Sequence, residues 1–286
     1  MMKTKKLFLI ASVGVGVGMA LAMTLAIGAF AQGMRGFEPQ PADQPAERTD
    51  SNSKLAHKQL LEKAREGRRN GSIGVYFEGD SITRRWGATD YPQFLEHWNR
   101  NFFGWNAADF GWGADSTQNI LWRLQNGELD GVNPKVIVLL AGTNNIGTFV
   151  APGAQDAKVE DVTKGISAIL KVMREKAPAA TILLTAIFPR NDNAKDPKAV
   201  IPVINRINKN LATMSDGKKI RYLDINDKLA DAEGILFDGM TVDKLHLAIP
   251  GYQVWADALK PLFHELIGPA AKEDHAPPPT GDPSAK

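Results

Sequence analysis

The sequence of 286 residues contains no cysteine. This absence excludes disulfides, thiolate nucleophiles and cysteine-ligated zinc or iron–sulfur sites. The chain also has little net charge, because 34 lysine and arginine residues nearly balance 32 aspartate and glutamate residues, and it has no long basic block. A nucleic-acid partner is therefore not expected. No His-Glu-x-x-His motif and no complete calcium-loop pattern occur, so the sequence implies neither a metal nor another cofactor.

Apolar residues, in contrast, are plentiful. Hydrophobic residues make up 43% of the chain, enough for a substantial core, and the 23% charged residues are too few for general disorder. The length favours one domain with extensions at its ends.

The N-terminus has the features of an export signal. Lys3, Lys5 and Lys6 precede an uncharged apolar stretch over residues 7–30, and Ala29-Phe30-Ala31 has the small-x-small pattern of a cleavage site. We expect residues 1–31 to be a signal peptide that directs the protein to the periplasm or the extracellular space. The apolar run is long enough to span a bilayer, so an uncleaved membrane tether through residues 7–30 is the alternative.

Two proline-containing segments flank the expected domain. Residues 32–52 combine three prolines with polar residues, which predicts a flexible linker. Residues 268–286 contain Pro277-Pro278-Pro279 and predict a disordered tail. The expected folded domain therefore spans residues 53–267.

Within that domain, short apolar runs alternate with amphipathic stretches, as in a parallel sheet covered by helices. The predicted strands span residues 73–77, 107–110, 135–141, 181–188 and 220–223. The run at 135–141 is apolar almost throughout, so this strand should be central and buried on both faces. The sequence thus predicts an α/β fold.

Three polar clusters follow predicted strands, at residues 79–83, 111–115 and 142–145. The loops at the carboxyl ends of parallel strands form the ligand crevice of such folds. These clusters are therefore expected to meet at one edge of the sheet.

The clusters, together with Asp243 and His246 further along the chain, contain the groups that acyl transfer requires. Ser81 offers a hydroxyl nucleophile, and His246 a base that Asp243, three residues earlier, can orient. The side chain of Asn144 and the backbone N–H groups of Ser81 and Ala114 can bind an oxyanion. Taken singly, a serine at a turn is most often a helix N-cap, and an Asp-x-x-His pair is most often a solvated ion pair. The Gly-x-Ser-x-Gly elbow of ordinary α/β-hydrolases is absent.

Four sequence blocks stand out, at residues 79–83, 110–124, 142–145 and 243–247. Together they resemble the SGNH (GDSL) hydrolase superfamily, in particular its branch similar to platelet-activating-factor acetylhydrolase catalytic subunits. The resemblance implies a flavodoxin-like, three-layer α/β/α fold with a five-stranded parallel sheet. It also implies Ser81 as nucleophile, His246 as base oriented by Asp243, and an oxyanion hole formed by Ser81, the second-block glycine and Asn144.

The chain departs from the family pattern at two positions of the second block. Ala114 occupies the place of the family's glycine, which keeps the N–H but adds a methyl group that would be strained at positive φ. Asp109 replaces the usual asparagine at the start of the block.

The expected activity is that of an exported serine esterase that removes a short acyl group, with acetyl as the expected group, from a carbohydrate or related small-molecule ester. Trp86 and Trp112 lie near Ser81 in the sequence and are candidates for packing against the sugar, although core or rim packing is an equal alternative. A lysophospholipase or thioesterase, which hydrolyses lipid esters, is a second hypothesis. A catalytically silent binding module on the same fold is a third.

Overall fold

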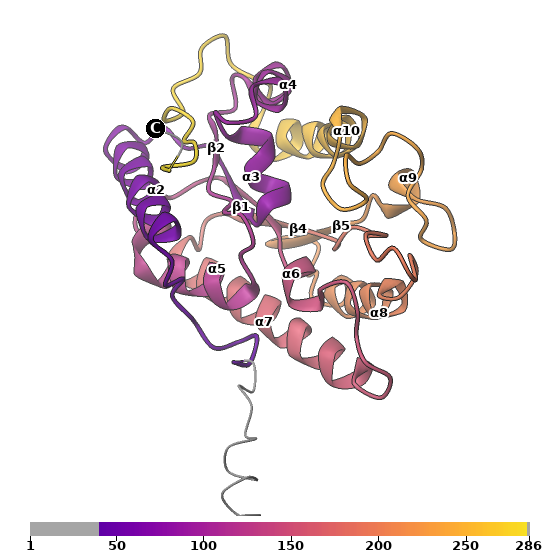
Figure 1. Cartoon of the computed structure of the whole chain (residues 1–286). Coiled ribbons are helices and arrows are strands. Elements are labelled where there is room, and N and C mark those ends of the chain that lie inside the picture. Colours follow the sequence, from indigo (N-terminus) through magenta and orange to yellow (C-terminus); the bar gives the residue numbers. More distant parts are fainter. Residues whose placement is uncertain (1–39, 285–286) are drawn as a thin grey trace, which may run out of the picture. The chain divides into compact units, whose positions relative to one another are not determined.

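A five-stranded parallel sheet organises the computed structural model, which describes residues 40–284 (Figure 1). The strands are β1 (Val75–Gly79), β2 (Ala107–Asp109), β3 (Val136–Leu140), β4 (Thr181–Thr185) and β5 (Ile220–Leu223). Their order is β2-β1-β3-β4-β5, and every neighbouring pair is parallel. The predicted α/β fold and its five strands are confirmed.

Strand β3 is central, as its apolar sequence predicted. All five of its residues are buried, because helices cover both faces of the sheet. Its pairing with β1 aligns Gly79 with Leu140, so the loops that follow these two strands begin side by side.

Two helical layers cover the sheet (Figure 1). One contains α2 (Ser51–Asn70), α5 (Thr117–Arg123), α7 (Gln155–Lys176) and α8 (Ile201–Ala212), with a helical continuation of α5 over Leu124–Glu128. The other contains α3 (Ser81–Gly87), α4 (Pro92–Phe102), α9 (Asn226–Leu229) and α10 (Ile249–Ile267). The short α6 (Thr143–Ile146) follows β3.

Prolines mark the starts of two helices. Pro202 lies in the first turn of α8 and Pro250 in the first turn of α10. The missing N–H of proline is no loss there, because the first N–H groups of a helix have no partner within it.

The segment before α2 is docked rather than free. Ala42 is fully buried, its N–H donates to Asp161 Oδ1 at 2.8 Å, and its carbonyl oxygen accepts from Thr117 Oγ1 at 2.8 Å. Asp50 caps α2, which begins at Ser51. The prediction of a flexible linker is thus wrong for residues 41–52; residues 32–39 lie outside the described range.

The C-terminal segment is docked too. Asp274 accepts hydrogen bonds from the backbone N–H groups of Gly104 (2.7 Å) and Asn106 (3.1 Å), and Lys63 donates to Thr280 Oγ1 at 3.0 Å. The predicted disorder is therefore wrong for residues 268–284. The composition of this segment offers little apolar surface to bury, but hydrogen bonds to the rest of the domain hold the segment in place.

No helix among residues 40–284 is both long and apolar enough to cross a bilayer. The predicted signal peptide or tether at residues 1–31 lies outside this range.

Candidate active site

Ser81 is the first residue of α3, immediately beyond the carboxyl end of β1. Asp80 caps the helix by accepting from the N–H of Ile82 at 2.9 Å. The turn is too tight for a side chain at Gly79, where a Cβ would lie 2.2 Å from Thr83 Oγ1 and 2.6 Å from the carbonyl oxygen of Leu140. The glycine thus allows β1 to turn directly into α3 and fixes Ser81 at the sheet edge.

A continuous hydrogen-bonded chain links the three predicted catalytic residues. Ser81 Oγ lies 2.9 Å from His246 Nε2, and His246 Nδ1 lies 2.7 Å from Asp243 Oδ2. With the ring proton on Nδ1, Nε2 is free to accept the hydroxyl proton of Ser81. The structure therefore brings together a hydroxyl, a base and a carboxylate in the order that nucleophile activation requires.

Asp243 and His246 lie in a loop, not on a helical turn. The loop is closed by a bridge between Thr241 and Leu247, and Lys244 adopts a left-handed φ of 65°. Asp243 Oδ1 also accepts from the backbone N–H of His246 at 2.7 Å. The carboxylate therefore fixes both the backbone and the ring of His246.

The surroundings of His246 and Asp243 also determine the protonation states of these two side chains. Burial lowers the pKa of His246, and the nearby charges of Arg85 and Arg190 lower it further, while Asp243 opposes them. Burial acts to raise the pKa of Asp243, but the hydrogen bonds from His246 outweigh it and the pKa is lowered. At neutral pH the imidazole is consequently neutral and the carboxylate ionised, the states required of a base and its orienting group.

The predicted oxyanion donors come from three neighbouring loops. The backbone N–H of Trp112 donates to the carbonyl oxygen of Gly79 at 3.1 Å, which ties the second block to the first. Ala114 in that block is exposed and has a φ of 63°, so its methyl group is in the strained region that the family's glycine would relieve. Asn144 donates one Nδ2 proton to the carbonyl oxygen of Asp115 at 2.9 Å, and the amide carries a second one.

Two polar residues after β4, Arg190 and Asn191, also hold this edge together and were not predicted. Arg190 Nη1 donates to the carbonyl oxygen of Thr143 at 3.0 Å, next to Asn144. The N–H of Asn191 donates to the carbonyl oxygen of Lys244 at 2.9 Å, between Asp243 and His246. The sequence signal was a polar run shortly after the fourth predicted strand, which marks the edge of the sheet but not the backbone partners of these two residues.

The two tryptophans predicted either to contact the substrate or to pack in the core or rim are both buried. Trp86 is fully buried, packed against Phe102, Tyr252 and Trp255, so its predicted contact with substrate is wrong. It lies five residues after Ser81, more than one helical turn, and faces the core instead of the site. Trp112 is 8% exposed, and its indole N–H donates to Ser53 Oγ at 2.9 Å.

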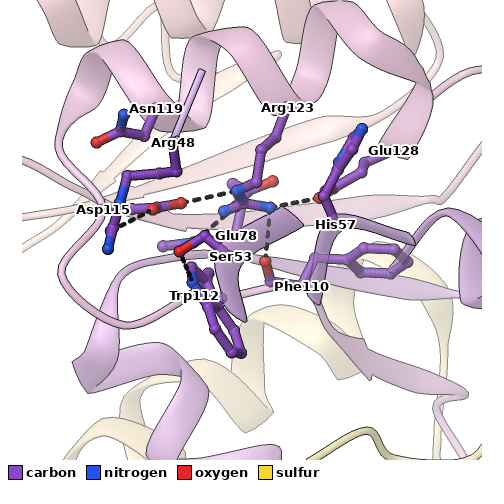
Figure 2. Close-up of polar contacts among 12 residues, drawn as sticks. Arg48, Ser53, His57, Glu78, Phe110, Trp112, Asp115, Asn119, Arg123 and Glu128 are labelled. Carbon is purple, nitrogen blue, oxygen red and sulfur yellow. Dashed lines mark hydrogen bonds and ion pairs between the residues drawn. The ribbon is translucent and has the colours of Figure 1, made fainter. Parts of the chain in front are cut away.

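Behind the second block lies a buried charge cluster around Arg123, shown in Figure 2. The guanidinium contacts Asp115 and Glu78 at 2.7 Å each and also Glu128. Burial raises the pKa of Glu78 to about 8 and that of Asp115 to about 6. Because the cluster joins β1 to the loop and α5, it holds the second block in place.

No group of three potential metal ligands exists among residues 40–284.

Residues 77–254 match the model of the GDSL-like lipase/acylhydrolase family. This match covers more than half of the chain. The chain belongs to that family. As a GDSL-like acylhydrolase it is a carboxylic ester hydrolase that acts on small-molecule esters.

Curated relatives and solved structures agree with this assignment. The chain is 33% identical to the platelet-activating factor acetylhydrolase IB subunit alpha2 of Rattus norvegicus, over 68% of this chain and 75% of the relative. It is 30% identical to subunit alpha1 of Bos taurus, over 73% and 83%. A candidate acylhydrolase from Bacteroides fragilis superposes with a TM-score of 0.59 at 18% identity, covering 76% of this chain and 99% of that one. The SGNH hydrolase fold is therefore confirmed.

Proposed function

We propose that the protein is a serine esterase that works through an acyl-enzyme on Ser81. His246 takes the hydroxyl proton as Ser81 attacks the ester carbonyl, and gives it to the departing alkoxide. Water then attacks the acyl-enzyme with His246 again as base, which releases the acid and restores Ser81. The hydrogen-bonded chain from Ser81 through His246 to Asp243 is the observation that carries this proposal.

The tetrahedral oxyanion is stabilised by the N–H groups of Ser81 and Ala114 and by the second Nδ2 proton of Asn144. Asn144→Ala should therefore lower kcat by about 10²- to 10³-fold, the loss typical of one oxyanion donor. Ser81→Ala should abolish turnover while the thermal unfolding curve is unchanged, and His246→Ala should be nearly as damaging. Wild-type turnover by Ser81→Ala, purified free of host esterases, would require a mechanism without this nucleophile.

The proposed substrate is a short-chain ester, namely an acetyl ester on an oxygen of a carbohydrate. Acetyl is supported by the names of the curated relatives, which are acetylhydrolases. The carbohydrate part rests on the predicted export and on the family resemblance, because Trp86 no longer supports it.

Chain-length preference separates this proposal from a lipid-ester hydrolase. We expect kcat/KM on a series of p-nitrophenyl esters to be highest for acetate and to fall with longer chains. A steady rise from acetate to long-chain esters would favour the lysophospholipase or thioesterase function, and no turnover of any ester would favour a silent binding module.

A further inference from the structure

A cavity of about 180 Å³ lies on the α2 side of Trp112 and is not part of the Ser81–His246–Asp243 chain. Its walls come from the docked segment 41–50, from α2 and from α5. Two indoles, those of Trp112 and Trp122, line it together with the imidazole of His57. The volume is below the roughly 300–1,000 Å³ of pockets for drug-sized ligands, so it suits a single ring.

The aromatic walls are held in fixed positions. Trp112 donates its indole N–H to Ser53 Oγ, as Figure 2 shows, and the Arg84 guanidinium lies 4.7 Å from the centroid of its ring; these two contacts fix the indole at the cavity wall. Trp122 packs against His57 with 4.8 Å between ring centroids, and His57 Nδ1 is 2.6 Å from Glu128. Rigid aromatic surface of this kind is well suited to pack against the C–H face of a sugar ring.

The rim of the cavity is cationic. Arg48, Lys54 and Lys58 line it, against one acid, Glu47. The ammonium groups of Lys54 and Lys58 have no hydrogen-bond or ion-pair partner among residues 40–284. Arg48 is paired with Asp50 at 3.1 Å and with Asp115 at 3.4 Å, and three buried carboxylates surround Arg123, so the uncompensated positive charge is that of Lys54 and Lys58. The available charge therefore favours a ligand that carries an anionic group.

We propose that this cavity binds a sugar ring bearing a carboxylate, a uronic acid residue. The ring packs against Trp112 and Trp122, and its carboxylate meets the ammonium groups of Lys54 and Lys58. Arg48 connects this cavity to the second block, because its Nη1 donates to the carbonyl oxygen of Gly113 at 3.1 Å. The proposal concerns binding alone and does not depend on the chemistry at Ser81.

The matched pair of D-galacturonate and D-galactose tests it, because the two sugars differ only in the carboxylate. In saturation-transfer NMR titrations of the purified protein, we expect saturable binding of galacturonate and at least tenfold weaker binding of galactose, a difference of about 1.4 kcal/mol. Inorganic phosphate should not displace galacturonate at equal concentration. Equal affinity for both sugars, displacement by phosphate, or no saturation by galacturonate up to about 20 mM would each overturn the proposal.

Variants locate the binding to this cavity. Lys54→Gln with Lys58→Gln should weaken galacturonate binding at least tenfold, and Trp122→Leu should abolish it. Lys171→Gln, an exposed change on α7, is the matched control and should leave binding unchanged. If Trp122→Leu proves unstable in thermal unfolding, the lysine variants decide. Unchanged affinity in the double lysine variant places the sugar elsewhere and contradicts the proposal.

Discussion

The methyl group of Ala114 introduces backbone strain into the loop of the second block. Its φ of 63° belongs to the left-handed region, where an L-residue costs about 1–2 kcal/mol. The backbone N–H that the proposed oxyanion hole uses is kept. The departure from the family's glycine therefore bears on the stability of the loop rather than on the number of donors.

Ala114→Gly should raise the stability of the protein without a large loss of activity. The strain relieved, about 1–2 kcal/mol, exceeds the roughly 0.4–1 kcal/mol that glycine adds to the entropy of the unfolded chain. Chemical denaturation should therefore show a higher midpoint, and kcat should stay within about threefold of wild type. A lower midpoint would mean that the alanine is not strained in solution.

The charge of Arg85 should affect the pH dependence of kcat/KM, because it lowers the pKa of His246. Protonated His246 cannot act as base, so kcat/KM falls as the pH drops through the pKa of His246, which burial and the charge of Arg85 hold below 6.5. Arg85→Gln removes one of the charges that disfavour the imidazolium, so the pKa rises and the acid limb moves to higher pH.

Arg100→Gln is the matched control for this measurement, since Arg100 pairs with Glu96 on α4. It should leave the acid limb in place. An acid limb that stays fixed in Arg85→Gln, or moves to lower pH, would show that Arg85 does not act on the imidazole.

At the scale of elements, the segments outside the helices and strands behave as part of the domain. Residues 41–50 lie along α5 and α7, and residues 268–284 reach back to α2 and to the turn before β2. Their order comes from side-chain and backbone hydrogen bonds with little apolar burial. Removal of a side chain that hydrogen-bonds these segments to the rest of the domain should consequently lower the stability of the whole domain.

Asp274→Ala tests this for the C-terminal segment. The carboxylate accepts from the backbone N–H groups of Gly104, Asn106 and Ala276, so its removal should lower the free energy of unfolding by about 1–3 kcal/mol. Urea denaturation measures the change. Glu273→Gln, an exposed neighbour, should be neutral. Equal stability of both variants and the wild type would mean that the segment is free in solution, as its composition predicted.

The strands and most site residues could be predicted from the sequence, whereas the docking of the end segments could not. All five strands and the central place of β3 follow from the apolar runs, because a buried parallel strand needs them. Ser81, Asp243, His246 and Asn144 were predicted as site residues from their motifs, and the structure places them at one edge of the sheet. Arg190 was missed, since its partner, the carbonyl oxygen of Thr143, is a backbone group that no motif reveals. The docked segments were missed for the same reason.

For the molecule as a whole, residues 1–31 predict export with cleavage after Ala31. N-terminal sequencing of the protein recovered from the envelope of its host should therefore begin at Gln32. Recovery of the intact N-terminus in the membrane fraction would instead establish the tether through residues 7–30.

The strand order has a kinetic consequence for a chain that is synthesised from one end. Val75 in β1 pairs with Val136 in β3, and Ser81 meets His246 across 165 residues of sequence. Sheets built from such distant pairings fold slowly, because each contact closes a long loop. Hydrolytic activity should therefore appear only after residues up to His246 have been made and the contact between His246 and Ser81 has formed.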